Sequence, residues 1–288
     1  MTGAGGLLGG RLAALLHGRG HEVLAACRRS PPPPGPRALP LELTDGPALE
    51  AALDALRPAA LVHSAALGVE RCEADPAEAE RINVLLPAAL ARLCRERGLR
   101  LVSLSTDLVF GGDRALSTEA DPPAPRSAYG RTKLAGEEAV LDALPSAAVV
   151  RVALVLGRGH GPRATSSESI VWAARAGRPL RLFVDEHRTP VDPGSVADAI
   201  DRLLARPAAG RFHLGGPERL SRLDLGRRVA RAFDLAEGAF APARQADHRG
   251  PDPRPADVSL DSSRARRELG WQPRPLDEAI REGRDGPA

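Results

Sequence analysis

The sequence has very few aromatic residues. They make up 3% of the 288 residues, with one tyrosine, two tryptophans and five phenylalanines. A nucleic-acid-binding surface usually combines a basic stripe with aromatic side chains on which bases stack. Here 40 basic and 37 acidic residues are interleaved along the chain and leave a net charge of only +3. The composition therefore argues against a nucleic-acid partner.

Paired cysteines and long apolar runs are also lacking. The three cysteines, Cys27, Cys72 and Cys94, stand far apart and match no metal-ligand spacing, so the sequence predicts no metal site. An odd number of isolated cysteines is typical of a reducing compartment. There is no secretory signal and no apolar run long enough to span a bilayer. We expect a cytoplasmic protein without a membrane partner.

Apolar strand patterns and helical patterns alternate along the first half of the chain. Strands are expected at 21–27, 59–66, 99–106 and 146–157, and helices at 2–20, 45–56, 75–98 and 127–144. The strand runs are continuously apolar, which is typical of a parallel sheet covered by helices on both faces. The pattern predicts an α/β fold with a doubly wound parallel sheet of the Rossmann type.

The rhythm becomes less regular after residue 157. A helix at 196–206 and a strand at 212–216 look like one more unit of the sheet. We therefore predict a nucleotide-binding domain over 1–156, completed by about 191–213. A smaller substrate-binding part would comprise 157–190 and 214–288.

A glycine-rich segment, TGAGGLLGG, opens the chain. Gly3, Gly6 and Gly9 have the spacing G-x-x-G-x-x-G, and Leu7 and Leu8 begin the helix that follows. Glycines let the backbone turn tightly and approach a pyrophosphate, which the helix N-terminus then stabilises. We assign all five residues to cofactor binding. The alternative is a flexible glycine-rich start.

This motif requires a preceding strand, and only Met1 precedes Thr2. In a doubly wound sheet that strand lies in the middle, so without it two inner edges lose their partner. Our expectation is that the natural protein begins several apolar residues upstream, and that Met1 stands where a GTG valine codon of a V-T-G stretch was read as the start. The alternative is a truncated and defective chain.

Two arginines follow the second expected strand. Arg28 and Arg29 occupy the place where an acidic residue would hold the ribose 2′-hydroxyl of NAD, and arginine accommodates the 2′-phosphate of NADP. We therefore expect NADP(H), with NAD(H) as the alternative, unless both arginines are ordinary surface charges. Further cofactor contacts are assigned to an acidic residue on the adenine side and to two small residues at a strand end: Asp45, Ala65 and Ala66.

The only tyrosine, Tyr129, stands four residues before the only lysine, Lys133, in SAYGRTKLAGE. On a helix these positions share a face. A phenol with its usual pKa near 10 is a poor acid–base group at neutral pH, and a nearby ammonium lowers that pKa. The pair is therefore a candidate acid–base site, and the plain alternative is an amphipathic tyrosine on a surface helix.

A hydroxyl that binds a reacting carbonyl oxygen would complete such a site. The buried strand 99–106 ends in Ser105 and Thr106. Ligands of open α/β sheets bind at the carboxyl ends of strands. Thr106 is our choice, with Ser105 as the alternative.

These motifs together resemble the extended short-chain dehydrogenase/reductases, and among them the dTDP-4-dehydrorhamnose reductases. The resemblance covers nearly the whole chain. It is carried by TGAGGLLG, STDLVFGG, YGRTKLAGE, FHLGGPERLSRLDLGRRVA and RPADVSLDSSRARRELGWQP.

The resemblance implies hydride transfer from NADPH to the C4 carbonyl of a nucleotide-linked deoxysugar. Thr106 would bind the carbonyl, Tyr129 would donate the proton, and Lys133 would hold the nicotinamide ribose and tune the phenol. It also implies a nucleotide-sugar substrate and is compatible with a homodimer. Substrate contacts are expected from five residues: Ser105, Asp107, Val109, Phe110 and Arg188.

Departures from the family pattern keep alternatives open. The family's D-Q-x-G-x-P-T reads DEHRTPV here, so Arg188 would either contact a substrate phosphate or be a solvated loop arginine. A sugar-nucleotide epimerase would use the same pair, whereas a dehydratase needs a second acid where Leu108 stands. A non-catalytic subunit, like the regulatory subunit of methionine adenosyltransferase, is the third alternative.

Overall fold

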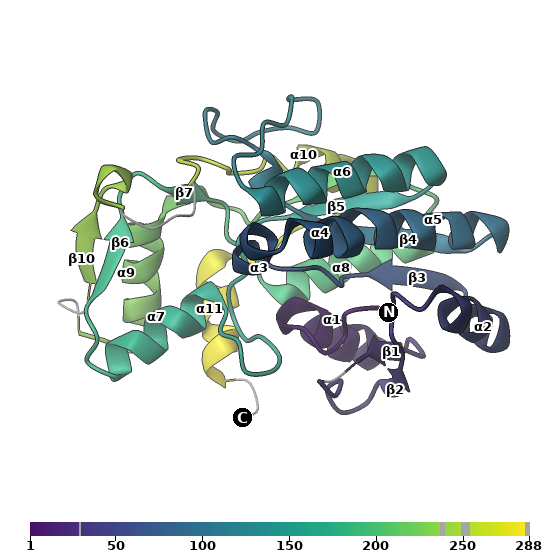
Figure 1. Cartoon of the computed structure of the whole chain (residues 1–288). Helices are drawn as coiled ribbons and strands as arrows, with labels where there is room; N and C mark the ends of the chain where they lie inside the picture. Colours follow the sequence, from purple (N-terminus) through teal and green to yellow (C-terminus); the bar gives the residue numbers. More distant parts are fainter. Residues whose placement is uncertain (29, 237–239, 249–253, 286–288) are drawn as a thin grey trace.

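The fold is an α/β arrangement around a parallel sheet (Figure 1). The computed structural model describes residues 1–28, 30–236, 240–248 and 254–285. One set of parallel strands has the order β3-β4-β5-β8, and β1 pairs with β2 beside it. These strands are β1 (Leu24–Cys27), β2 (Arg37–Pro40), β3 (Ala60–His63), β4 (Arg100–Thr106), β5 (Ala148–Val152) and β8 (Gly210–Leu214). The predicted doubly wound fold is confirmed.

Thr2 joins the two sets of strands. It forms isolated parallel bridges to Ala26 of β1 and to His63 of β3. Its amide donates to the carbonyl of Val62 at 2.9 Å, and the amide of Ala26 donates to the carbonyl of Met1 at 2.8 Å. Below this bridge an apolar cavity of about 50 Å³ lies between β1, β3 and α2 (Gly46–Leu56). Thr2 thus connects the inner edges of β1 and β3, which were expected to be unpaired.

Helices cover both faces of the sheet. On one face, leucines of α1 (Leu7–Gly18) and apolar residues of α8 (Pro193–Ala205) pack on Val102, Leu104 and Val150. On the other, α2, α5 (Leu86–Glu96) and α6 (Ala128–Ala143) pack on Leu61 and Leu101. Two short helices, α3 (Val69–Ala74) and α4 (Pro76–Glu80), precede a π-helical turn at Arg81–Leu85. The two covered faces explain why the strand sequences are continuously apolar.

A second group of elements lies to one side of the sheet (Figure 1). In it β6 pairs with β10 in parallel and β7 pairs with β9 in antiparallel orientation. Its own apolar cluster joins α7, α9 and α11. The elements are α7 (Ser166–Arg175), β6 (Leu180–Phe183), β7 (His187–Arg188), β9 (Leu220–Ser221), α9 (Arg222–Ala232), β10 (Phe240–Ala243) and α11 (Leu276–Asp285). Helix α10 (Ser263–Leu269) instead packs on the main sheet beside β8 and α8. The domain boundaries stay a prediction.

No helix in the described ranges is both long enough and apolar enough to cross a membrane.

Candidate active site

Thr106, Tyr129 and Lys133 come together where β4 ends and α6 begins. Ser127 caps α6 by accepting the amide of Gly130 at 3.0 Å, which places Tyr129 in the first turn and Lys133 one turn later. The ammonium of Lys133 donates to the carbonyl of Leu104 in β4 at 2.8 Å. The Thr106 hydroxyl lies near enough to the Tyr129 phenol to lower its pKa. The helix thus presents its phenol and ammonium to the carboxyl end of the strand.

The Tyr129 phenol is a protonated acid at neutral pH. Burial raises its pKa to about 12, and the charge of Asp107 adds to the effect, while the Thr106 hydroxyl opposes it. The expectation of a lowered phenol pKa is therefore wrong for this structure, because burial and the charge of Asp107 raise the pKa of Tyr129. A protonated phenol is the form that donates a proton to a developing alkoxide.

Of the ionisable groups at this site, Lys133 has a pKa closer to 7 than that of Tyr129. Burial lowers its pKa to about 8, while the negative charge of Glu137 opposes the shift. The ammonium is therefore fully present below about pH 8 and is lost as the pH rises through that value.

We expect kcat/KM for carbonyl reduction to fall above about pH 8. The pKa of this fall should be that of Lys133 in the protein without substrate, since kcat/KM reports the groups of the free enzyme. The measurement is the rate of cofactor oxidation from pH 6 to 10 at several ionic strengths. A profile that stays flat to pH 10 would contradict the assignment of the Lys133 ammonium to the reaction.

Glu137 anchors a buried ionic cluster behind the lysine. Arg151 donates to its carboxylate through Nε at 3.0 Å and Nη2 at 2.7 Å, and both side chains are 1% exposed. Arg211 and Ser105 add donors at 3.0 and 2.5 Å. Burial raises the pKa of Glu137, but the hydrogen bonds and charge of Arg151 more than offset this, so the pKa lies below its usual value.

Ser105 belongs to this cluster and not to the substrate side. Successive side chains of a strand point to opposite faces, so Ser105 and Thr106 cannot both face the Tyr129 phenol. The Ser105 hydroxyl donates to Glu137. This contact favours Thr106 as the hydroxyl beside the phenol, and the role of Ser105 as a substrate contact stays a prediction.

Val109 and Phe110 are core residues. Val109 is fully buried and Phe110 is 4% exposed, both within the main apolar cluster. The Phe110 ring meets the His213 ring edge-on at 5.5 Å and lies 5.1 Å from the Arg151 guanidinium. The chain turns in a short 3₁₀ helix at Asp107–Val109, which directs these side chains inward. Their burial disfavours direct contact with a substrate, and their assignment as substrate residues stays a prediction.

A second buried cluster surrounds Glu186 and adjoins Asp107. Glu186 accepts from Arg254 at 2.7 Å and lies 3.1 Å from Arg188 and 3.9 Å from Arg222. Arg188 is 6% exposed, so the interpretation of it as a solvated loop residue is wrong. Its Nε lies 3.9 Å from the carboxylate of Asp107.

Two polar atoms of this cluster, Asp107 Oδ2 and Arg222 Nη1, are buried without a hydrogen-bond partner in the described structure. Burial raises the pKa of Asp107 to about 6, with the Arg188 charge opposing, and burial lowers the pKa of Arg222 to about 10. Sequence reasoning did not assign Glu186, Arg222 or Arg254 to the site. Arg254 opens the RPADVSLD motif, which was the available signal, whereas Arg222 had none.

The glycine segment forms a cradle that side chains would fill. A Cβ on Gly9 would lie 2.2 Å from the carbonyl oxygen of Gly3, and Gly3 itself has a φ of 70°. Gly6 is the N-cap of α1 and offers no side-chain oxygen to the first-turn amides. Uncapped amides at a helix start bind anions such as phosphate. The cradle therefore fits the diphosphate of a dinucleotide.

A groove of about 570 Å³ runs from this cradle along the carboxyl ends of β1, β2 and β3. Most predicted cofactor residues line it, namely Gly3, Gly6, Leu7, Leu8, Gly9, Arg28, Ala65 and Ala66. Arg29 lies outside the described residues. Asp45 is not among the lining residues, because its carboxylate caps α2 by accepting the amide of Ala48 at 3.1 Å. Thr44 and Leu43 line the groove in its place.

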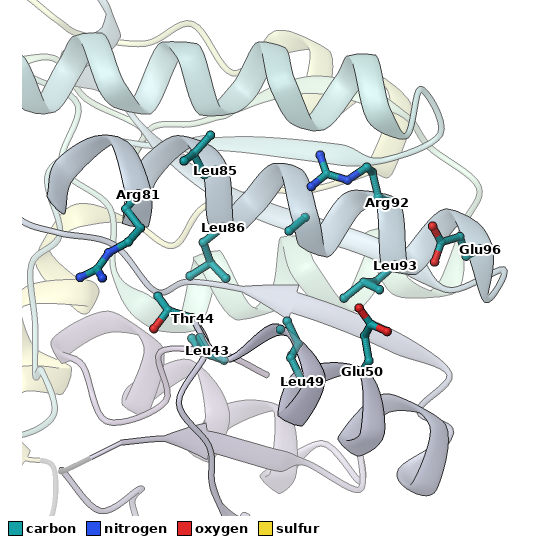
Figure 2. Close-up of a pocket in the computed structure, with 12 residues that line it drawn as sticks. Leu43, Thr44, Leu49, Glu50, Arg81, Leu85, Leu86, Arg92, Leu93 and Glu96 are labelled. Atoms are coloured by element: carbon teal, nitrogen blue, oxygen red, sulfur yellow. The ribbon is translucent and has the colours of Figure 1, made fainter. Parts of the chain in front are cut away.

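The groove continues into a recess of about 320 Å³ between α2 and α5 (Figure 2). Leu43 and Leu49 face Leu86 and Leu93 across it, and charged side chains stand at its rim. Leu43, Thr44, Arg81 and Leu86 line both spaces. This end of the groove is therefore apolar and open, unlike the phosphate cradle at its other end.

A doubly wound sheet with a glycine cradle, and with threonine, tyrosine and lysine at one strand end, defines a dinucleotide-binding protein of the short-chain dehydrogenase/reductase type. The chain belongs to the family described as the RmlD substrate binding domain, whose model matches residues 1–285. The predicted family resemblance is thereby confirmed.

Individual relatives agree with this family. The chain is similar to a probable dTDP-4,6-dihydroxy-2-methyloxan-3-one 4-ketoreductase of Streptomyces antibioticus, with 37% identity over 89% of this chain and 84% of the relative. A solved structure of a hypothetical dTDP-4-dehydrorhamnose reductase from Sulfolobus tokodaii superposes with a TM-score of 0.82 and 31% identity, covering 94% of both chains. WbmG of Bordetella bronchiseptica, solved with NAD and UDP, gives 0.82 and 26% over 98% of this chain and 92% of its own.

Proposed function

We propose that this protein is an NAD(P)-dependent oxidoreductase that reduces the 4-keto group of a nucleotide-linked deoxysugar. The observation that carries the proposal is the place of Tyr129 in the first turn of α6, one turn before the buried Lys133, whose ammonium donates to the carbonyl of Leu104 near Thr106 at the end of β4. The family and the printed activities of the relatives support it.

Reduction of a carbonyl needs a hydride on carbon and a proton on oxygen. The bound nicotinamide cofactor would supply the hydride. In this chain, Thr106 would hold the carbonyl oxygen and the Tyr129 phenol would give it the proton. The Lys133 ammonium would then stabilise the phenolate and hold a ribose hydroxyl of the cofactor. The glycine cradle and the first amides of α1 would bind the diphosphate.

Arg28 supports NADP(H) as the cofactor. It lines the groove, and its guanidinium lies 3.2 Å from the Glu42 carboxylate, with both side chains about half exposed. An exposed pair of this kind is held weakly. Arg28 can therefore turn to a 2′-phosphate, while Glu42 offers an acceptor to a 2′-hydroxyl. This arrangement favours NADP(H) and leaves NAD(H) as a usable alternative.

The charged cluster beside Thr106 supports a substrate that carries phosphate. Arg188, Arg222 and Arg254 face only two carboxylates, those of Glu186 and Asp107. The remaining positive charge and the unpartnered Nη1 of Arg222 suit an anionic group. A nucleoside diphosphate attached to the sugar would supply it. The cytoplasmic location and the homodimer stay predictions.

The test is a substrate panel at fixed NADPH. We expect oxidation of NADPH with a dTDP-4-keto-6-deoxyhexose and none with the free keto sugar, which lacks the diphosphate. Replacing NADPH by NADH should lower kcat/KM. Interconversion of sugar epimers without net NADPH use would indicate an epimerase instead. Binding of NADPH without turnover of any keto sugar nucleotide would favour a non-catalytic subunit.

A further inference from the structure

We propose that Arg163 is a phosphate-binding residue of the cofactor groove, supplied by the loop 157–165 that leads into α7. The inference rests on the proposed function in that it takes a dinucleotide as the occupant of the groove. Arg163 would contact the dinucleotide from a segment other than the glycine segment and the strand ends. Nothing in the sequence patterns pointed to this loop.

The base of the loop is tied together by its own hydrogen bonds. The Thr165 hydroxyl donates to the carbonyl of Gly157 at 2.6 Å, and the amide of Gly157 donates to Ser167 at 2.8 Å. Glu168 accepts the amides of Thr165 and Gly159 at 2.8 and 3.3 Å. These hydrogen bonds fix both ends of the loop. Its residues can therefore contact only the segments next to it.

The tip of the loop rests on the glycine segment. The amide of His160 donates to the carbonyl of Leu7 at 3.0 Å, and its Nε2 lies 3.1 Å from the carbonyl of Pro31. The imidazole occupies the space above Gly10, where a Cβ would come within 2.2 Å of the ring. These contacts hold the loop over the start of α1, between the phosphate cradle and the segment that follows β1.

Arg163 lines the groove from this position and is exposed. The other described arginines of the groove have acidic partners, Glu42 for Arg28 and Glu78 for both Arg71 and Arg81. Arg163 has no hydrogen bond or ion pair to any described residue. It is thus an uncompensated cation beside uncapped helix amides.

Arginine and helix amides together are a recurrent way to bind phosphate, because the guanidinium fork matches two phosphate oxygens. A nicotinamide dinucleotide phosphate offers two such groups near this loop. The diphosphate would lie on the cradle, and the 2′-phosphate would lie toward Arg28 and Pro31. Both groups present phosphate oxygens to an arginine. Fragments of the cofactor that carry only one of the two groups can show which one Arg163 binds.

The experiment compares full-length wild type with Arg163→Met and with Arg175→Met as the control. Arg175 is exposed on α7 and is not a lining residue of the groove. Isothermal titration would measure the affinity for NADPH, for ADP-ribose, which lacks the 2′-phosphate, and for 2′,5′-ADP, which lacks the diphosphate. We expect Arg163→Met to weaken NADPH binding about tenfold or more, since a hydrogen bond to a charged group is lost.

The fragments identify the phosphate. Weaker binding of ADP-ribose with unchanged 2′,5′-ADP would assign Arg163 to the diphosphate, and the reverse pattern would assign it to the 2′-phosphate. Binding of all three ligands within twofold of wild type would overturn the inference and leave the proposed function standing. A wild-type protein that binds none of them would contradict the proposed function as well.

Discussion

Phenylalanine in place of Tyr129 is expected to lower kcat for keto-sugar reduction by about 10²- to 10⁴-fold, the usual contribution of a positioned general acid. The substitution removes the phenol that carries the proton and leaves the ring that packs beside Cys72 and Ile82. The pKa of about 12 means that this phenol is protonated at every working pH. The measurement is single-turnover NADPH oxidation at saturating sugar nucleotide.

The affinity for NADPH serves as the control for this variant. It should stay within a few-fold of wild type, because the glycine cradle and the groove are untouched. Thr106→Val is the matching variant in β4. It keeps Tyr129 but removes the hydroxyl proposed to hold the carbonyl oxygen, so its kcat should also fall. Wild-type kcat in Tyr129→Phe would refute the assignment of the proton donor.

Glutamine in place of Glu137 is expected to destabilise the protein by about 3–5 kcal/mol, the cost of leaving one partner of a buried ion pair uncompensated. Arg151 is 1% exposed and points two donors at the carboxylate. Water cannot replace the lost charge there without opening the core around Phe110 and His213. Urea unfolding would measure the free-energy change from the shift of the midpoint at constant slope.

Glu138→Gln is the control, since Glu138 is the neighbouring residue on the same helix and is exposed. We expect its stability to stay within about 0.5 kcal/mol of wild type, as is usual for surface substitutions. Loss of less than about 1 kcal/mol in Glu137→Gln would show that the pair is not the electrostatic anchor described here. The same variant should lower the pKa of Lys133 further, because the opposing negative charge is removed.

The sheet and the tyrosine–lysine pair could be predicted because their signals are local. A continuous apolar run predicts a buried parallel strand, and a spacing of four on a helix predicts a shared face.

Residues near strand ends are harder to assign from the sequence. Strand alternation places Ser105 and Thr106 on opposite faces, and the contact of Ser105 with Glu137 is visible only in the fold. Val109 and Phe110 were assigned by resemblance, whereas the turn after β4 directs them into the core. Asp45 follows β2 by several residues, and its role as a helix cap has the signal D-G-P at a helix start.

The remaining features depend on contacts between distant segments, which no local pattern encodes. The cluster around Glu186 joins side chains from β7, α9 and the segment at Arg254. The loop at His160 meets the glycine segment from more than 150 residues away. In so arginine-rich a chain, the partners of a given arginine follow from the fold and not from its neighbours in sequence.

The most direct test of the proposed function follows the hydride itself. The wild-type protein would be incubated with NADPH carrying deuterium at both hydrogen positions of nicotinamide C4 and with a dTDP-4-keto-6-deoxyhexose, and the product would be analysed by NMR. The proposed reaction predicts one deuterium at C4 of the product sugar, with a single configuration at that carbon and one NADPH consumed per product. A product without deuterium at C4, or label at another carbon, would contradict the proposal that this protein is a 4-keto reductase.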